Sequence, residues 1–420
     1  MKKVIGILLI VCMIFMLGSC VRSEQLQEDR VLDDGQLQDM LQYEQNDNDQ
    51  EENVQEDEEN YDYETVPPQF EGKIAIVASD FGGQRELEAV EALQRKFGDR
   101  IVRRFWPLYW DTETKKEILL EIATDPEVEV LIIATVSSWA DLAVGAFRDI
   151  REDVLIVYID SWIDEEIIER ADLHIVTNQA RFASNYVYHA IEMGAETIIH
   201  YTTEFHMAAW HPAIMRRDIM KEIAQHKGIS FISIEIPDLL ESTPERLGFL
   251  KDDLPKQMSV HGTHAAFYAT ISAFQIPLIT HAIETGAILP STSRSSPLDE
   301  ISAVLGIDGF FWGAPFPTID MPSYKALINA MREEAVAIEA TGRLGSLPMD
   351  QRELYTLMAA EYAIRWINGE VDRDYIDLDV LTEIGREIIY RETGEPVGAS
   401  LERHPDHPNF ILAMMDFIVY

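Results

Sequence analysis

The sequence predicts an α/β protein of two doubly wound parallel-sheet lobes, joined by a hinge and followed by a C-terminal helical extension. Two observations predict this class. Short β-branched apolar runs alternate with amphipathic segments of helical spacing, and the same alternation occurs again in the second half of the chain. With 420 residues, of which 47% are hydrophobic, the chain is long enough for two or three domain cores.

The first twenty residues predict a targeting segment. Lys2 and Lys3 precede an almost wholly apolar stretch, residues 4–16, which has the length of a signal-peptide core and is shorter than a membrane span. The stretch leads to Leu17-Gly18-Ser19-Cys20, which resembles the lipobox of bacterial lipoproteins. That resemblance implies cleavage before Cys20 and lipidation, including palmitate, of its thiol. A signal anchor, or a secretory signal with an incidental cysteine, remains the alternative.

Residues 21–71 are expected to be an acidic, disordered tether. Between residues 21 and 66, 17 Asp and Glu oppose only Arg22 and Arg30, so like charges and few apolar groups prevent collapse. The segment carries about −15 of the formal net charge of −40. It is either a passive spacer or a docking tail for a basic partner. A chain this negative repels phosphate backbones, which disfavours nucleic-acid binding.

The body is expected to begin with a first α/β lobe, at 72–180. Apolar β-branched runs predict buried strands, and Gly, Pro or polar residues separate them from helices. The expected strands are 73–79, 101–105, 128–135, 154–159 and 173–177, and the expected helices are 85–97, 114–123, 139–147 and 181–193.

A second lobe is expected at 181–300, and residues 301–345 are expected to return to the first. The remaining 346–420 is expected to be mostly helical and to pack on the lobes. The expected strands are 197–201, 230–236, 265–270 and 287–290, the helices are 216–226, 244–260, 277–285, 324–340, 351–368 and 381–390, and 301–317 is a strand-and-loop return.

A lipobox-like signal, an acidic tether and two α/β lobes together resemble type I periplasmic binding proteins. Within that group, the segments 216–220, 249–257 and 342–345 look like an uncharacterised family of bacterial lipoproteins. The resemblance spans about residues 72–370 and implies a ligand between the lobes, at the carboxyl ends of the strands. Open parallel sheets favour the same place. Thr270-Ile271-Ser272 departs from the Asn-Asp of many sugar-binding members, which puts a simple monosaccharide in doubt.

Candidate ligand-binding residues are those that follow the predicted strands. Hydroxyls, amides and carboxylates there can orient a ligand, and Trp can stack on it. Helix caps, turns and surface positions are the structural alternatives. The expected ligand-binding residues are Ser79, Asp80, Phe81, Ser137, Ser138, Trp139, Asp160, Trp162, Asn178, Arg181, Thr202, Ser272 and Asp308.

The function these patterns favour is an extracytoplasmic solute-binding lipoprotein, anchored to the bacterial cell membrane through Cys20, that delivers a small polar ligand to an ABC permease. A nucleoside or modified sugar suits the residue types. No GxSxG, Walker A or GxGxxG motif occurs, so neither catalysis nor a cofactor is expected. Alternatives are a sensor acting on a membrane receptor, and a metal-dependent hydrolase using the histidines of residues 200–211, although their spacings of six and five match neither HExxH nor a helical i, i+4 pair.

Overall fold

The computed structural model describes most of the chain beyond the predicted signal and tether. Cys20 and the rest of residues 1–68 lie outside the described part. The described residues are 69–79, 83–106, 112–134, 141–160, 170–236, 243–293, 296–307 and 322–420.

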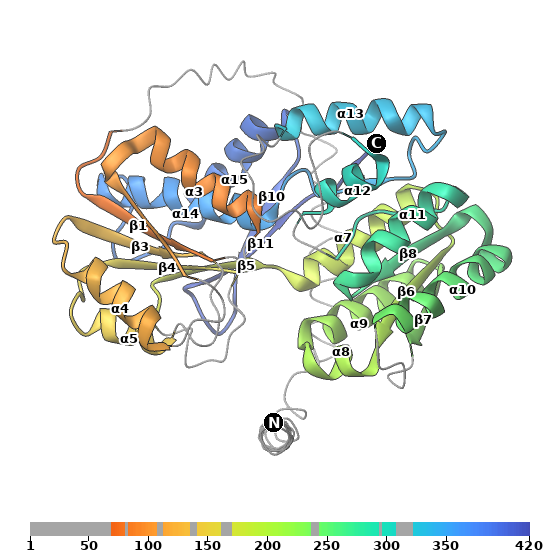
Figure 1. The fold of residues 1–420 in the computed structure, drawn as a ribbon, viewed down its shortest axis with the longest axis horizontal. Coiled ribbons are helices and arrows are strands. Elements are labelled where there is room, and N and C mark those ends of the chain that lie inside the picture. Colours follow the sequence, from red (N-terminus) through yellow and green to blue (C-terminus); the bar gives the residue numbers. More distant parts are fainter. Residues whose placement is uncertain are drawn as a thin grey trace, which may run out of the picture. The chain divides into compact units, whose positions relative to one another are not determined.

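A seven-stranded sheet organises the N-terminal half, in the order β10-β11-β5-β4-β3-β1-β2 (Figure 1). All neighbouring pairs are parallel except β10 with β11. Every residue of β4 and β5 is buried, as expected of central strands covered on both faces. The strands are β1 (Lys73–Ala78), β2 (Ile101–Phe105), β3 (Val128–Ile133), β4 (Leu155–Ile159), β5 (Leu173–Thr177), β10 (Ala399–Arg403) and β11 (Phe410–Met415).

Helices cover both faces of this first sheet (Figure 1). One face carries α3 (Gln84–Phe97), α14 (Gln351–Ile367) and α15 (Leu378–Thr393), and the other carries α4 (Thr112–Ala123) and α5 (Asp141–Arg148). The core on the second face packs helix side chains, such as those of Leu119 and Phe147, against strand side chains such as Tyr158, all of them fully buried. A short 3-10 turn, η1 (Gly98–Arg100), joins α3 to β2.

The second sheet has the order β7-β6-β8 and is parallel. Single parallel bridges, Ala266 to Ile288 and Leu289 to Leu344, continue it toward a two-stranded antiparallel pair. The elements are β6 (Thr197–Thr203), β7 (Ser230–Ile236), β8 (Ala265–Ala269), β9 (Gly345–Ser346), β12 (Ile418–Val419), α7 (Gln179–Glu192), α8 (Glu204–Ala209), α9 (His211–His226), α10 (Thr243–His261), η2 (Gly262–His264), η3 (Ser272–Phe274), α11 (Gln275–Thr285), α12 (Pro297–Leu305) and α13 (Tyr324–Ala337).

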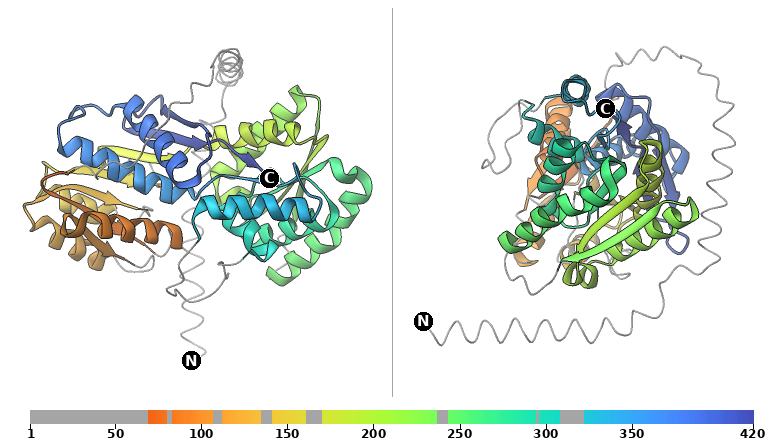
Figure 2. Two further views of the ribbon diagram at one scale, coloured as in Figure 1. Left: turned by 90° about the horizontal axis from the view of Figure 1, so that it is seen from above. Right: turned by 90° about the vertical axis from the view of Figure 1, so that its right-hand side faces the viewer.

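The described chain passes between the two sheets at three places. Asn178 joins β5 to α7, residues 347–350 join β9 to α14, and residues 416–417 join β11 to β12. Figure 2 shows α7 leaving the first sheet at the end of β5 and the C-terminus returning toward the second sheet. This double α/β arrangement confirms the predicted fold class, and the three connections lie where a hinge would have to be.

Two features differ from the sequence-based expectation. The expected return at 301–317 is wrong at its start, because residues 301–305 belong to helix α12. Pro297 lies in its first turn and Gly306 ends it in the left-handed conformation, and these end signals outweigh the apolar run. Part of the C-terminal segment forms β10 and β11, because the apolar run FILAMM finds its partner in β5, more than two hundred residues away.

The division into lobes at residues 180, 300 and 345 stays a prediction. Over the described residues, no helix combines the length and the apolar composition that crossing a membrane requires.

Candidate ligand-binding site

Six of the predicted ligand-binding residues lie in the described part of the chain. Ser79 follows β1, Asp160 follows β4 and Asn178 follows β5, as expected for strand-end positions. Asp80, Phe81, Ser137, Ser138, Trp139, Trp162 and Asp308 lie outside the described residues.

Asp160 ties the end of β4 to helix α14. Its backbone has a positive φ of 46°, and its Oδ2 accepts a hydrogen bond from Arg352 Nε at 2.7 Å. Both side chains are mostly shielded from solvent, so the carboxylate already has a cationic partner. Asp160 therefore contributes to the packing of α14 on the first sheet, and a ligand would have to compete with Arg352 for it.

Asn178 acts as the N-cap of α7. Its Oδ1 accepts a hydrogen bond from the backbone N–H of Arg181 at 2.9 Å, and its Nδ2 donates to Glu402 Oε2 at 3.4 Å. An N-cap side chain satisfies a helix donor that would otherwise lack a partner. Asn178 is therefore a helix cap, which was the structural alternative to a ligand contact. It fixes the start of the helix that leads to the second sheet.

Polar side chains meet at the carboxyl end of the second sheet. Thr202, near the end of β6, has its Oγ1 2.9 Å from Thr270 Oγ1, which follows β8. The Thr270 oxygen is also 3.1 Å from His206 Nδ1. The pairing of Tyr201 with Ala269 in the adjacent parallel strands sets the two threonines side by side. Ser272, two residues beyond, is exposed at the start of η3.

Arg216 is the most notable residue beside this cluster, and strand-end reasoning missed it. It lies on α9 and is 3% exposed. Its Nε donates to Gln179 Oε1 at 2.6 Å, and its Nη1 donates to the Tyr268 hydroxyl at 2.9 Å. Gln179 is the first residue of α7 and Tyr268 is one residue from the end of β8. The guanidinium therefore sits between the crossing helix and the end of the second sheet.

Two aromatic rings flank the same guanidinium. Its central carbon lies 3.9 Å from the centroid of Phe182 and 5.4 Å from that of Trp210. Cation–π contacts of this kind stabilise a charge and hold the guanidinium plane in place. With Gln179 bound at Nε and Tyr268 bound at Nη1, the side chain is fixed before any ligand binds.

The partners of Arg216 are all neutral. Burial raises the pKa of the Tyr268 hydroxyl, which the nearby Arg216 charge offsets only in part, so the phenol stays protonated. Burial, followed by the charge of Arg216, lowers the pKa of His206 below its ordinary value. Among the described residues, no Asp or Glu forms an ion pair with Arg216. A buried charge without a counter-ion is costly, so this arrangement needs an explanation.

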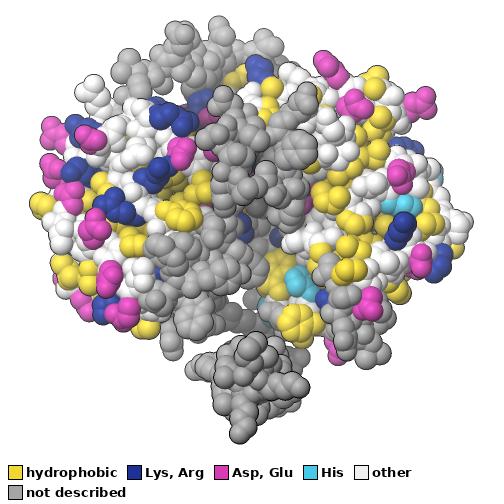
Figure 3. Space-filling model, viewed as in Figure 1, with side chains coloured by type: hydrophobic (Ala, Val, Ile, Leu, Met, Phe, Trp, Pro, Cys, Tyr) yellow, Lys and Arg dark blue, Asp and Glu magenta, His cyan; other side chains and the backbone are white. Residues whose placement is uncertain are grey.

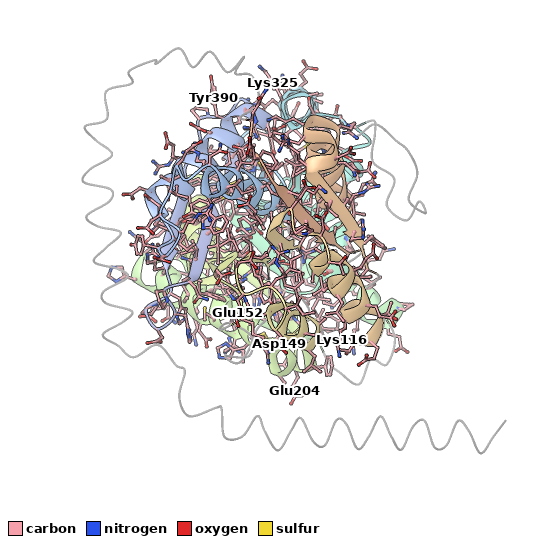
Figure 4. The ribbon with its side chains drawn as sticks, turned by 90° about the vertical axis from the view of Figure 1, so that its left-hand side faces the viewer. Lys116, Asp149, Glu152, Glu204, Lys325 and Tyr390 are labelled. Atoms are coloured by element: carbon pink, nitrogen blue, oxygen red, sulfur yellow. The ribbon has the colours of Figure 1, made fainter. Side chains whose placement is uncertain are left out.

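Many charged side chains elsewhere on the molecule are solvated. Asp149, Glu204 and Lys325 are exposed and lie at the periphery of the ribbon in Figure 4. On the face drawn in Figure 3, acidic and basic side chains are interspersed on both halves, and that face carries no continuous basic patch. Arg216 differs from these residues because its side chain is buried.

A signal for Arg216 does exist in the sequence. The buried positions of α9 include Ala213, Arg216, Met220 and Ile223, a spacing of three, four and three residues. An arginine on the apolar face of an amphipathic helix is unusual, because that face turns toward the protein interior. This spacing, rather than a strand end, could have identified it.

Comparison with known proteins places the chain in a family. A family model described as "Protein of unknown function (DUF3798)" matches residues 73–345. The chain belongs to this family. The matched range of the DUF3798 member includes β1 to β8 and Arg216, whereas β10 and β11 lie beyond it. A search of curated proteins finds no match.

Solved structures resemble the DUF3798 member in fold. A protein assigned as a transcriptional regulator from Clostridium difficile 630 has a TM-score of 0.72 at 17% identity, covering 84% of this chain and 100% of that one. A sugar ABC transporter protein from Actinomyces odontolyticus ATCC 17982 has a TM-score of 0.46 at 12% identity, covering 71% of this chain and 84% of that one. A sugar-binding protein of a sugar ABC transporter from Bacillus halodurans has a TM-score of 0.47 at 11% identity, covering 72% of this chain and 89% of that one. The likeness concerns the fold alone.

The histidine-rich segment of the DUF3798 member does not form a cluster of metal ligands. His200 is fully buried, stacks between Phe231 and Tyr268, and has its Nδ1 2.9 Å from Ser233 Oγ. Burial lowers the pKa of His200 to about 3, so it is a neutral core residue. His211 is exposed at the start of α9. Within the described ranges, no three His, Cys, Asp or Glu side chains are grouped as a metal ion would need.

Proposed function

We propose that this protein is an extracytoplasmic solute-binding lipoprotein that binds a small polar ligand at the carboxyl ends of its strands. The observation that carries the proposal is the buried, pre-positioned Arg216 beside the polar chain of Thr202, Thr270 and His206. Binding sites in open α/β sheets lie beyond the strand ends, and a few fixed polar groups among aromatic side chains are typical of them.

The location of Arg216 suggests how binding could act on the whole molecule. Its partner Gln179 lies on the first turn of α7, directly after the connection from the first sheet. A ligand that contacts this cluster and the strand ends of the first sheet at once would favour a closed arrangement about the three connections. Delivery of the closed form to an ABC-type permease is the function we propose.

The anchor completes the proposal. Lipidation of Cys20 would hold the protein at the outer surface of the cell membrane, with the acidic segment to residue 71 as the tether. Labelling cells with a palmitate analogue tests this point directly. The wild-type protein should incorporate the label, and a Cys20→Ser variant should not and should leave the membrane fraction. Equal labelling of the two proteins would contradict a lipid on this thiol.

Mass spectrometry of the intact protein tests ligand binding. The protein is purified in detergent and measured under native and then denaturing conditions. We expect a small molecule that is bound in the first measurement and released in the second. A smaller radius of gyration in solution scattering, measured after that molecule is added back, would support closure. If no molecule is retained and no metabolite in a broad panel shifts the melting temperature, the binding function is wrong.

A further inference from the structure

Arg216 leaves most of its hydrogen-bonding capacity unused by the described residues. A guanidinium carries five N–H donors. Two are used, Nε–H by Gln179 and one Nη1–H by Tyr268, which leaves 5 − 2 = 3, one on Nη1 and two on Nη2, around the outer edge of the group. No described residue accepts from these three. Because the Phe182 ring covers the face of the group, a further acceptor must approach along this edge.

The other arginine of comparable burial shows what a buried guanidinium can bind in this protein. Arg85 is 7% exposed, and its Nε and Nη2 donate to the two carboxylate oxygens of Asp299 at 3.1 and 2.7 Å. Its remaining Nη1 donates to the backbone carbonyl of Pro322 at 3.2 Å. Arg85 is thus neutralised by a two-point carboxylate contact, the geometry for which the planar guanidinium is suited. Arg216 has the same shape and burial without the carboxylate.

We infer that the ligand itself supplies this group, and that Arg216 binds the carboxylate of a small carboxylic acid. The inference rests on the proposed binding function and specifies its substrate class. A single guanidinium balances one negative charge, which matches a carboxylate. A phosphate monoester carries nearly two negative charges. The nearest further cation along α9 is Arg217, and it is already paired with Asp218 at 2.7 Å.

The surroundings describe the rest of the ligand. Trp210, which is partly exposed, offers apolar surface, while the hydroxyls of Thr202 and Thr270 and the ring of His206 offer neutral hydrogen-bonding groups nearby. A carboxylic acid with hydroxyl substituents satisfies both kinds of surface. A neutral sugar would leave the buried charge of Arg216 without a counter-ion.

The test compares Arg216→Gln with Arg217→Gln in the full chain. The control makes the same substitution one residue further along α9, at a cation that Asp218 already neutralises. Melting shifts and titration calorimetry are recorded with a panel of hydroxy and sugar acids, their neutral amide and alcohol counterparts, and phosphorylated sugars. We expect acids to stabilise the wild type and Arg217→Gln. Their affinity should fall at least about 100-fold in Arg216→Gln, as loss of charged hydrogen bonds predicts.

The other outcomes separate this inference from the proposed function. If acids and their neutral counterparts bind equally well, the inference of a carboxylate ligand is wrong, but the proposed binding function stands. If only phosphorylated compounds bind, the ligand is still an anion, but it is not a carboxylic acid and the inference is wrong. Absence of any binder, with no co-purified molecule, would refute both.

A further readout does not depend on ligand choice. In the ligand-free protein, Arg216→Gln should melt within a few degrees of the wild type, because no internal ion pair is lost, whereas Arg85→Gln should melt far lower. If Arg216→Gln destabilises the free protein as much as Arg85→Gln does, an internal carboxylate pairs with Arg216 and the inference is wrong.

Discussion

The two most buried arginines described in this protein have opposite surroundings. Arg85, on α3, meets Asp299 of α12 in a two-point ion pair and lies 4.3 Å above the ring of Tyr324 on α13. Arg216, on α9, has an amide, a phenol and two rings as its partners. The first arrangement is complete and joins three helices. The second holds a charge in place without neutralising it, which is costly unless something else binds there.

The Arg85 region contains a wider polar network. Tyr324 donates from its hydroxyl to Glu353 on α14 and accepts from the backbone N–H of Asp350 at 3.0 Å. The network therefore links helices that are distant in sequence and fixes α13 and α14 near α3. The contrast indicates that buried charge in this fold serves stability at one place and recognition at the other.

The largest expected effect comes from making Arg85 resemble Arg216. Asp299→Asn keeps the size of the side chain but removes the carboxylate, so Arg85 becomes a buried cation without a counter-ion. Breaking one partner of a buried pair costs about 3 to 5 kcal/mol of unfolding free energy. Denaturant unfolding of Asp299→Asn and the wild type measures this. A loss below 1 kcal/mol would show that the two arginines do not differ as described.

A pH effect of similar size is expected in the Arg85 region. Burial is the main cause that raises the pKa of Glu353 from 4.5 to about 8. Between these values the folded protein binds more protons than the unfolded chain, so unfolding free energy falls as pH rises from about 4.5 to 8. At about 1.36 kcal/mol for each pKa unit, this difference corresponds to a loss of about 5 kcal/mol across the window. Glu353→Gln should remove most of that slope, and an unchanged slope would locate the titration elsewhere.

The converse change makes Arg216 resemble Arg85. Gln179→Glu replaces the amide oxygen that accepts from Arg216 Nε with a carboxylate of nearly the same size. The new internal ion pair should raise the unfolding free energy by about 1 kcal/mol, since Gln179 is only partly buried. It should also compete with an acidic ligand and weaken its binding. Unfolding curves and calorimetry on the same sample check both effects, and unchanged stability with unchanged binding would argue against an unneutralised Arg216.

The fold could be read from the sequence because its signals are local. The strand expected at 73–79 is observed at Lys73–Ala78, and the helix expected at 351–368 is observed at Gln351–Ile367. The apolar run of β1 and the helical spacing of α14 are each contained in a short window. The strand β11 could not be assigned in this way, because its pairing with β5 depends on a contact across the whole body.

The candidate site could be predicted from the sequence only in part, because it also depends on contacts between distant segments. Asp160 and Asn178 do follow strands, as the sequence predicts. However, the Asp160 carboxylate is paired with Arg352, and the Asn178 side chain caps α7. Arg216 lies in mid-helix, and its meaning depends on the absence of a carboxylate among described residues from several other elements. Sequence spacing can mark it as buried, but only the assembled structure shows which partners surround it.

The smallest expected effect concerns His206, whose ring lies beside Thr270 and is influenced by the charge of Arg216. Burial and then the charge of Arg216 lower its pKa below 6.5 in the free protein. A bound carboxylate would offset the Arg216 charge and raise that pKa, so binding would take up protons. We therefore expect the affinity for an acidic ligand to rise a few-fold as pH falls below the ordinary pKa of histidine. The effect should vanish in His206→Asn, which keeps a polar side chain near Thr270. Calorimetry in two buffers of different ionisation enthalpy measures the proton uptake directly, and a ligand that binds with no uptake in the wild type would show that its charge does not reach Arg216.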